Sequence, residues 1–365
     1  MSEFPLVSVI VLNYNAGELL LNCIDSLKRS TYTNLEILVV DNISSDNSQK
    51  KCKEKFPDIK LIQNEKNFGY CEGNNVGIRN AKGEFIVILN PDTIVDTYWL
   101  KELFSAYKKY GEGLYQPKHL SMKEKSVFMS AGNMFHVFGF GYAREKGNED
   151  KKQFEKIEEI GYASGTCLFT STKTFEKVGL LDPFIFLYHD DLDFGWRAAH
   201  LGIKSYYIPS SIIYHAESYS LKWSPEKFFW LERNRKYCLL THYSKETYSK
   251  LRPTLFLIDL IVILIFGGVD TTRSQLGFMM ALFDQYPEQW HFLREEPSLV
   301  PSAIEEAIRA WPTTTWSTRE PKKNFIFDGV EFIKGETIHL LVHASAKDPA
   351  LGNFPEFDIR TKQQR

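Results

Sequence analysis

Four nearly unbroken apolar runs in the first 90 residues constrain the fold more than any other feature of the chain. They read LVSVIVLNY at 6–14, LEILVVDN at 35–42, IKLIQN at 59–64 and EFIVILN at 84–90. Apolar runs without alternation are typical of strands that are buried on both faces of a parallel sheet. Helical patterns separate them at 17–29, 44–56 and 73–83, and Ser44 and Ser45 offer N-caps for the second. The sequence therefore predicts a βαβαβαβ unit of the α/β class.

A short segment that contains acids or amides follows each of these runs. The segments comprise Asn13, Tyr14 and Asn15, then Asp41 and Asn42, then Asn64 and Asn67, and finally Asn90, Pro91 and Asp92. Parallel sheets bind ligands beyond the carboxyl ends of their strands. A turn-forming Asn or Asp is the alternative for any one of these residues, but their joint recurrence favours a binding crevice. Asp92 would present an oxygen ligand for Mg²⁺ or Mn²⁺ there.

A second acidic cluster reads YHDDLDFGWR at 188–197. It lies between a strand predicted within 161–179 and a returning strand at 203–215. Residues 148–158 read as a charged loop or helix face, to which we assign no function. Close carboxylates at Asp190, Asp191 and Asp193 repel and raise the pKa of at least one group, which indicates a general base or a metal site. The alternative is that these acids only start a helix near Leu192 and pair with Arg197. That alternative suits Asp193 better than Asp191.

Composition indicates an ordinary globular protein with one large domain and a smaller module. The chain has 365 residues, a formal net charge of -2, 43% hydrophobic and 25% charged residues, so nucleic acid is not an expected partner. Its five cysteines form no CxxC pair, which suits free thiols in a reducing cytosol. The N-terminus lacks a basic n-region, so a cytoplasmic location is expected.

One further apolar run, Leu255 to Phe266, is too short to span a bilayer and contains Asp259. It is either a buried helix or an interfacial segment that contacts the inner face of the cell membrane.

Six blocks of the sequence resemble family-2 inverting glycosyltransferases of the GT-A fold. The blocks are VSVIVLNYN, VVDNISSDNS, NFGYCEGNNVGI, ILNPDT, SGTCLFTSTKTFEKVGLLDPFIFLYHDDLDFGWR and YIPSSIIYH, in that order. The likeness is greatest to the rhamnosyltransferase-like branch that builds cell-surface polysaccharide, and it covers about residues 5–250. It implies a Rossmann-like mixed sheet, a nucleoside diphosphate sugar as donor, and a saccharide or lipid-linked saccharide as acceptor.

The resemblance also implies roles for individual residues. Asp41 would contact the base of the donor nucleotide. The pocket for the nucleotide sugar would be formed by Asn13, Asn15, Asn67, Gly69, Asn75 and Asn90. Asp92 would hold Mg²⁺ or Mn²⁺ on the diphosphate, with His215 as a further ligand or, alternatively, as a hydrogen-bonded histidine at a strand end. Asp191 would be the catalytic base, with Asp190 beside it. Asn90 replaces the first acid of the family's acid-x-acid motif, so only modest metal affinity is expected.

From Gly267 onward the chain resembles a different family, the cytochromes P-450. GGVDTTRSQLGFMMALFDQYPEQW is similar to their oxygen-binding helix, in which an acid and an alcohol match Asp270 and Thr271. PSLVPSAIEEAIRAWPT is similar to the ExxR helix with Glu306 and Arg309, which could also be a plain i,i+3 pair. ASAKDPALGNFPEFDIR resembles the segment before the haem loop.

No cysteine follows Cys238 in this sequence, so the haem thiolate is missing and haem is not expected. Residues 267–365 are therefore interpreted as a truncated P-450-like fragment, fused to a transferase domain (1–250) through an apolar connecting helix (251–266). Such a fragment should expose apolar surface, including Trp290, Trp311, Trp316 and Phe325. Residues 325–343 read as a hairpin or small sheet, with turns at Asp328-Gly329 and Lys334-Gly335.

Three functions remain open from the sequence. The first is a metal-dependent inverting glycosyltransferase, and the second is a sugar-nucleotide-binding protein without turnover, if the tail blocks the acceptor cleft. The third is a haem monooxygenase that uses the tail. Metal-dependent nucleotide binding, sugar transfer and a Soret band distinguish them.

Overall fold

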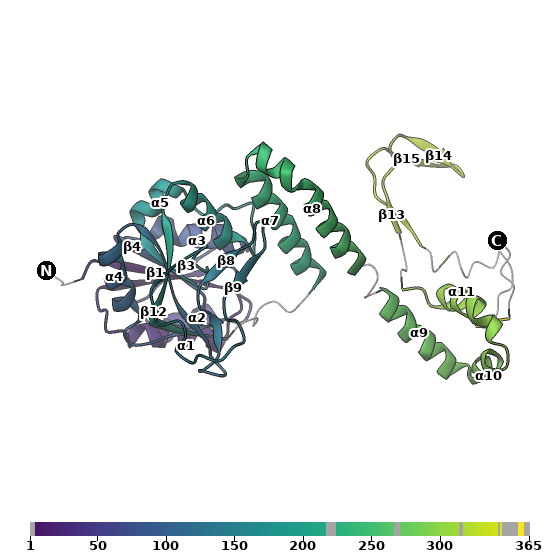
Figure 1. Ribbon diagram of the computed structural model, residues 1–365, viewed down its shortest axis with the longest axis horizontal. Coiled ribbons are helices and arrows are strands. Elements are labelled where there is room, and N and C mark those ends of the chain that lie inside the picture. The colour runs from purple at the N-terminus through teal and green to yellow at the C-terminus, as the bar shows by residue number, and fades with distance from the viewer. Residues whose placement is uncertain are drawn as a thin grey trace. The chain divides into compact units, whose positions relative to one another are not determined.

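The structure is a computed structural model that describes residues 4–216, 224–265, 271–313, 317–341, 344 and 357–360. The chain divides into two compact units, an N-terminal unit (Met1–Leu251) and a C-terminal unit (Arg252–Arg365), shown in Figure 1. Helices of the N-terminal unit are α1 (Glu18–Lys28), α2 (Ser48–Lys55), α3 (Gly69–Asn80), α4 (Trp99–Tyr110), α5 (Thr172–Val178), α6 (Asp190–His200) and α7 (Pro225–His242). Helix α8 (Lys245–Ile265) begins there and continues past the division.

One mixed sheet organises the N-terminal unit. Its strands are β1 (Val7–Asn13), β2 (Leu35–Asp41), β3 (Lys60–Gln63), β4 (Phe85–Leu89), β5 (Thr93–Val95), β6 (Gly113–Ser121), β7 (Phe128–Ser130), β10 (Glu158–Ile160), β11 (Cys167–Ser171) and β12 (Lys204–His215). The order is β10-β12-β6-β11-β4-β1-β2-β3, with β5 beside β12 and β7 beside β6. A separate hairpin pairs β8 (Asn133–Phe135) with β9 (Gly141–Ala143).

The four apolar runs of the sequence are neighbouring parallel strands, as predicted. β1 pairs in parallel with both β2 and β4, and β2 pairs in parallel with β3. β11 then joins β4 and β6 in antiparallel register, while β6 and β12 are parallel. The mixed α/β fold class is therefore confirmed.

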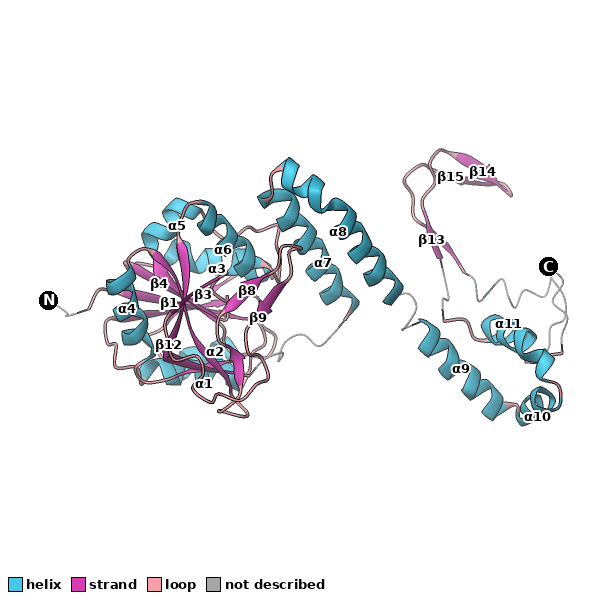
Figure 2. Cartoon of the chain, viewed as in Figure 1, coloured by secondary structure: helices cyan, strands magenta, loops and turns pink. Residues whose placement is uncertain are grey.

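Helices pack on both faces of this sheet, as Figure 2 shows. One face forms the largest core cluster, in which alternate strand residues such as Val9 and Val87 pack with apolar residues of α1 and α4. On the other face α3 approaches the strands through glycines. An added Cβ at Gly77 would lie 2.4 Å from Ile10, and one at Gly73 would lie 2.6 Å from Leu12. These glycines allow α3 to lie close against β1.

Two local predictions about the helices were wrong. Helix α2 begins at Ser48 with Asn47 at its N-cap, and neither Ser44 nor Ser45 caps it. The Ser44 hydroxyl instead accepts hydrogen bonds from the Asn13 amide (3.0 Å) and the Asn15 N–H (2.9 Å), which tie two strand ends together. Helix α6 begins at Asp190 rather than near Leu192.

The charged loop at 148–158 has a structural role that the sequence did not indicate. Lys118 on β6 is 3% exposed, and its Nζ donates to Asp150 Oδ2 (2.8 Å) and Glu155 Oε1 (2.6 Å) in that loop. A buried ammonium group needs such partners because burial without them carries a large desolvation cost. The loop therefore closes over β6.

The C-terminal unit contains helices and small two-stranded sheets in its described parts. They are α9 (Thr271–Gln285), α10 (Pro287–Glu295), the 3₁₀ helix η2 (Pro297–Leu299), α11 (Val300–Ala310), β13 (Ser317–Arg319), β14 (Phe325–Phe327), β15 (Val330–Phe332) and β16 (Ile338–Leu340). The predicted hairpin is observed, because β14 and β15 pair around Asp328-Gly329, and both turn residues have positive φ. β16 pairs instead with β13.

Apolar side chains are exposed in the C-terminal unit, as expected. Trp290, Trp311 and Phe325 are 43%, 36% and 40% exposed, while Trp316 lies outside the described residues. On α8, Phe256 and Leu257 are 70% and 54% exposed, so the buried-helix alternative does not hold for them. Among the described residues, no helix combines the length and apolar character that a bilayer crossing requires.

Candidate active site

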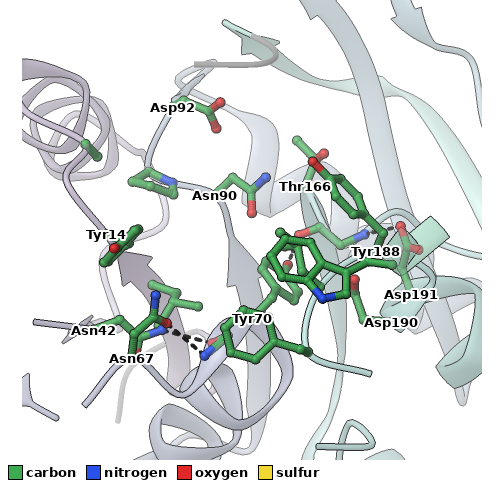
Figure 3. Close-up of a pocket in the computed structure, with 18 of the residues that line it drawn as sticks. Tyr14, Asn42, Asn67, Tyr70, Asn90, Asp92, Thr166, Tyr188, Asp190 and Asp191 are labelled. Carbon is green, nitrogen blue, oxygen red and sulfur yellow. Dashed lines mark hydrogen bonds between the residues drawn. The ribbon is translucent and has the colours of Figure 1, made fainter. Parts of the chain in front are cut away.

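A cavity of about 680 Å³ opens at the carboxyl ends of the central strands. Figure 3 shows Tyr14, Asn42 and Asn67 on one side and Tyr188, Asp190 and Asp191 on the other, with Asn90 between them. Asp92 and His215 also line it. This volume lies within the usual range of small-molecule pockets and suits a ligand of the size of a nucleotide sugar. The predicted crevice thus corresponds to this cavity.

Asn42 and Asn67 form the amide-rich side. Asn42 is 2% exposed, and its Nδ2 donates to the carbonyl of Gly69 (2.9 Å) while its Oδ1 accepts from Asn64 (2.8 Å). Asn67 Oδ1 accepts from the Gly69 N–H (2.9 Å) at the start of α3. These bonds hold the ends of β2 and β3 against α3 and leave the Asn67 amide nitrogen available to a ligand.

Asn13 and Asp41 are fully buried and are not among the residues that line the cavity. The Asn13 amide donates to Asp41 Oδ1 (2.7 Å), and Asp41 Oδ2 accepts from Ser44 N (2.9 Å) and Gln63 Nε2 (2.7 Å). Buried carboxylates require such donors. In this structure the two residues therefore join the strand ends beneath the cavity. Asn15 likewise lies outside the lining and accepts from Ser45 N (2.7 Å).

Asn75 does not line the pocket, contrary to the expectation from the sequence. It is 1% exposed, and its amide donates to Leu181 O (2.8 Å) while its Oδ1 accepts from Leu181 N (3.0 Å). Both polar ends of the side chain are occupied by one residue that lies 106 positions away in the chain. Asn75 therefore joins α3 to the loop that follows α5.

Asp92 in the turn before β5 and His215 at the end of β12 come together. His215 ends β12, and its register partner is Thr93, next to Asp92. His215 Nε2 lies 3.3 Å from Asp92 Oδ2, while Asp92 Oδ1 is buried without a hydrogen-bond donor among the described residues. An unpartnered carboxylate oxygen beside an imidazole at a cavity wall suits a divalent cation such as Mn²⁺. The residues present therefore fit the expected metal.

Asp190 and Asp191 begin α6 and both line the cavity. Burial raises the pKa of Asp190 well above its ordinary value, and the adjacent Asp191 carboxylate raises it further. Burial also raises the pKa of Asp191, but the N–H groups of Gly165 (3.0 Å) and Leu192 (2.8 Å) stabilise its charged form. Asp191 is therefore the member of the pair that ionises more readily.

Asp193 is not among the residues that line the cavity, and its contacts agree with the alternative of a structural role. Its Oδ2 accepts from Arg197 Nε (2.9 Å), and its Oδ1 lies 2.8 Å from His242 Nε2 on α7. Arg197 Nη1 also donates to Val178 O (2.9 Å) at the end of α5. Asp193 thus links α6 to α7, and its partner Arg197 links α6 to the end of α5.

Several residues of the cavity were missed by sequence reasoning. They are Tyr70, Thr166, Phe186, Leu187, Tyr188, Lys227 and Trp230. Tyr70 donates to the Gly165 carbonyl (2.6 Å), and the Phe186 and Trp230 rings lie 5.4 Å apart. Lys227 and Trp230 lie on α7, where no sequence pattern distinguished the inward face from the rest of the helix.

Gly69 offers a test of how closely the cavity wall is packed. Its φ is +74°, and an added Cβ would lie 2.5 Å from both the ring and the carbonyl of Phe186. We expect Gly69→Ala to destabilise the protein by more than the ~1–2 kcal/mol that a left-handed residue costs. Gly111→Ala is the control, because Gly111 has φ +78° and no atom within 4 Å of an added Cβ. Urea denaturation midpoints measure the stability of both variants. Equal losses of stability would contradict close packing of Gly69 against Phe186.

The predicted residues of the tail lie in the C-terminal unit. Arg309 donates to both carboxylate oxygens of Glu306, each at 2.7 Å, and Glu306 is 1% exposed. Glu306 also accepts from the Asp358 N–H (3.1 Å). Thr271 is the first residue of α9, and Asp270 lies outside the described residues.

Comparison with known proteins identifies the first part of the chain. The Glycosyl transferase family 2 profile matches residues 8–179. Residues 8–179 form a family 2 glycosyltransferase domain. The matched segment includes β1 to β4, β11 and the residues of the amide-rich side, and it ends before Asp190 and Asp191.

Two curated relatives are glycosyltransferases. The low-salt glycan biosynthesis hexosyltransferase Agl10 of Haloferax volcanii is 28% identical over 205 residues, which cover 54% of this chain and 63% of that protein. The N-acetylglucosaminyl-diphospho-decaprenol L-rhamnosyltransferase of Mycobacterium tuberculosis is 26% identical over 235 residues, which cover 58% of this chain and 76% of that protein. The chain therefore spans less than two thirds of Agl10.

A solved structure supports the GT-A fold. The crystal structure of GalNAc-T7 with UDP, GalNAc and Mn²⁺ matches with a TM-score of 0.50 at 16% identity, covering 59% of this chain and 44% of that one. The α/β family 2 domain therefore has the GT-A architecture that the sequence predicted.

A luteothin monooxygenase of Streptomyces thioluteus is also similar. It is 33% identical over 107 residues, which cover 29% of this chain and 26% of that protein. This match does not establish a P-450 fusion, so the interpretation of residues 267–365 stays a prediction.

Proposed function

We propose that this protein is a metal-dependent inverting glycosyltransferase that moves a sugar from a nucleoside diphosphate sugar to a saccharide or lipid-linked saccharide, in cell-surface polysaccharide synthesis. One observation carries the proposal. A single cavity of the N-terminal unit contains an amide-rich side, an Asp92–His215 pair with an unpartnered oxygen, and a buried carboxylate pair. These are the groups that donor binding and displacement require.

The amide-rich side would bind the nucleotide. Asn67 and Asn42 offer hydrogen-bonding groups, and the Tyr14 ring is 47% exposed at the cavity wall, where a base could stack on it. Asp92 and His215 would hold Mn²⁺ or Mg²⁺, and that ion would neutralise the charge that builds on the departing diphosphate. GalNAc-T7, which shares the fold, was solved with UDP and Mn²⁺, and this supports the proposal.

Asp191 would act as the base. As the acceptor oxygen forms its bond to the anomeric carbon, the bond to the diphosphate breaks and the acceptor proton passes to the Asp191 carboxylate. Attack from the side opposite the leaving group inverts the anomeric centre, as in inverting glycosidases with a sugar hydroxyl in place of water. Figure 3 shows Asp191 across the cavity from Asn67, in agreement with attack from the opposite side.

The acceptor would lie against the aromatic wall beside Asp191, formed by Phe186, Tyr188 and Trp230. Flat aromatic faces bind the apolar faces of sugar rings. The rhamnosyltransferase relative is named for a diphospho-decaprenol acceptor, so lipid-linked saccharides belong in the acceptor panel. An acceptor of that kind would bring the protein to the inner face of the cell membrane, where exposed apolar residues of α8 such as Phe256 could contact lipid.

Trp230→Ala tests the acceptor wall. We expect the KM for the acceptor to rise about tenfold, because a ring that covers the sugar is removed, while the affinity for nucleotide stays unchanged. Phe229→Ala is the control, since Phe229 is the neighbouring residue on α7, is 58% exposed and is not part of the cavity. Equal KM values in the two variants would remove Trp230 from the acceptor site.

Calorimetric titration with UDP and dTDP, each with and without Mn²⁺, tests the function as a whole. We expect binding that depends on Mn²⁺, followed by transfer from matching nucleotide sugars to members of a saccharide and lipid-saccharide panel. Binding without transfer would favour a sugar-nucleotide-binding protein. Failure of either nucleotide to bind would contradict the proposed donor site.

We also infer that residues 267–365 are a P-450-like fragment that does not bind haem. The buried Glu306 paired with Arg309 agrees with the ExxR resemblance, and the sequence has no cysteine after Cys238 to supply a thiolate. A Soret band with a 450 nm carbonyl complex after incubation with haem would contradict this inference.

A further inference from the structure

Helix α7 lies beyond the segment that matches the family profile, yet it carries the contacts that support the carboxylate pair. The α5–α6 loop (residues 179–189) leads directly into Asp190 and Asp191. Its last two residues, Tyr188 and His189, have φ values of 67° and 65°. A left-handed conformation costs a residue with a side chain about 1–2 kcal/mol, so other contacts must hold the loop in this form.

Asn234 on α7 supplies the central contact. It is fully buried, and its Nδ2 donates to two consecutive carbonyls of the loop, Leu187 O at 2.9 Å and Tyr188 O at 2.8 Å. Both hydrogens of the amide are thus used on the left-handed turn itself. Arg233 Nε donates to Asn234 Oδ1 (2.9 Å), which fixes which end of the amide faces the loop.

Other side chains of α7 bind the same segment on either side of this point. Arg233 Nη2 donates to Phe184 O (2.9 Å), and the Tyr237 hydroxyl donates to Asp182. His242 reaches Asp193 on α6, just after the carboxylate pair. Contacts from one helix therefore hold the segment both before and after Asp190 and Asp191.

We propose that Asn234 is a positioning residue for sugar transfer, which locks the left-handed turn at Tyr188 and His189 and so aims the Asp190–Asp191 pair into the cavity. The catalytic effect of Asn234 rests on the proposed function. Its structural effect on the turn does not, because the geometry of the turn is independent of the substrate. Displacement of a catalytic group by about 1 Å can lower a rate by about 10²-fold.

Asn234→Asp is the sharpest variant, because it keeps the shape of the side chain and its ionised form, which the adjacent Arg233 favours, has neither donor. We expect kcat for transfer to fall about 10²-fold, with an unchanged KM for the donor and unchanged Mn²⁺-dependent affinity for UDP. Asn234→Ser retains one donor, and we expect its kcat to fall about tenfold. Tyr243→Phe is the control, because it removes one hydrogen bond from the end of α7 to a different loop, at Val137 O (2.9 Å), and should leave kcat unchanged.

The pH profile distinguishes positioning from a loss of stability. Once the loop relaxes, water reaches the carboxylate pair, so the acid limb of kcat should move to lower pH by about one unit in Asn234→Asp. Other titratable groups around the pair are Tyr70, Cys71, Tyr162, Tyr188, Asp193 and Cys238. A variant that only lost stability would keep the acid limb in place, and this result would overturn the proposal.

Hydrogen exchange of residues 182–193 separates failure of this proposal from failure of the proposed function. Faster exchange in Asn234→Asp than in wild type, confined to this segment, is expected even if no acceptor is turned over. If exchange is faster in Asn234→Asp but the wild type transfers no sugar, the glycosyltransferase function is contradicted, whereas the role of Asn234 in holding the turn is supported. Unchanged exchange would overturn the role of Asn234 whatever the activity.

Discussion

Replacement of Asp191 by Asn is expected to lower kcat for sugar transfer by about 10³-fold, because an amide cannot accept the proton of the acceptor hydroxyl. The amide keeps the size of the carboxylate, and Asp191 lies across the cavity from the amide-rich side. The affinity for UDP with Mn²⁺ should therefore remain within about twofold of wild type. Single-turnover transfer and calorimetry on the same samples measure the two quantities.

Asp190→Asn is the matched comparison for Asp191→Asn. Burial and the neighbouring carboxylate favour the protonated form of Asp190, and an amide resembles a neutral carboxylic acid in shape and charge. We therefore expect a loss of about tenfold or less at neutral pH. A larger loss of kcat in Asp190→Asn than in Asp191→Asn would mean that Asp190, and not Asp191, is the base.

The pH dependence of transfer follows from the same environment. A base must be ionised, and burial raises the pKa of Asp191 above 3.8, the ordinary value. Activity should therefore rise with pH through a midpoint above that value, and fall on acidification before the fold is lost. A profile that stays flat down to the ordinary pKa of a carboxyl group would argue against a buried aspartate as the base.

Replacement of Asp92 by Ala is expected to lower the Mn²⁺-dependent affinity for UDP by about 10²-fold, which corresponds to about 2.7 kcal/mol. The reason is that Asp92 is the carboxylate that we propose to hold the metal, and position 90 carries an amide. Affinity without metal should change little, because the nucleotide then contacts the amide-rich side alone. Calorimetry with and without Mn²⁺ measures the difference.

Asp96→Ala is the control for Asp92→Ala. Asp96 is four residues further along the chain, accepts from the Tyr98 N–H (3.0 Å) and does not line the cavity. We expect it to bind UDP as wild type does. His215→Ala should give a smaller loss than Asp92→Ala, since a neutral imidazole contributes less to holding the cation than a carboxylate. Equal UDP affinity with and without Mn²⁺ in wild type would remove the metal from the proposal.

Much of the N-terminal unit follows from local pattern. The apolar runs predicted β1 to β4 because strands buried on both faces need apolar residues throughout, and their polar ends predicted the edge at which Asn90 and Asp92 line the cavity. The β14–β15 turn followed from Asp328-Gly329, since few other residue pairs adopt two positive φ values. In each of these cases the signal and the structure lie within a few neighbouring residues.

The sequence by itself thus determined the α/β class and the edge of the sheet at which the cavity lies, and it indicated the acids Asp92, Asp190 and Asp191 that line this cavity. Only the tertiary structure decided which polar side chains line the cavity and which form hydrogen bonds that join one helix, strand or loop to another. Asn67 lines the cavity, whereas Asn75 bonds Leu181, and the two amides look alike in the sequence. The support of Asp190 and Asp191 by Asn234 was equally hidden. The physical reason is that a buried polar group takes its partner from whatever element packs against it, and packing brings together residues that are far apart in the chain.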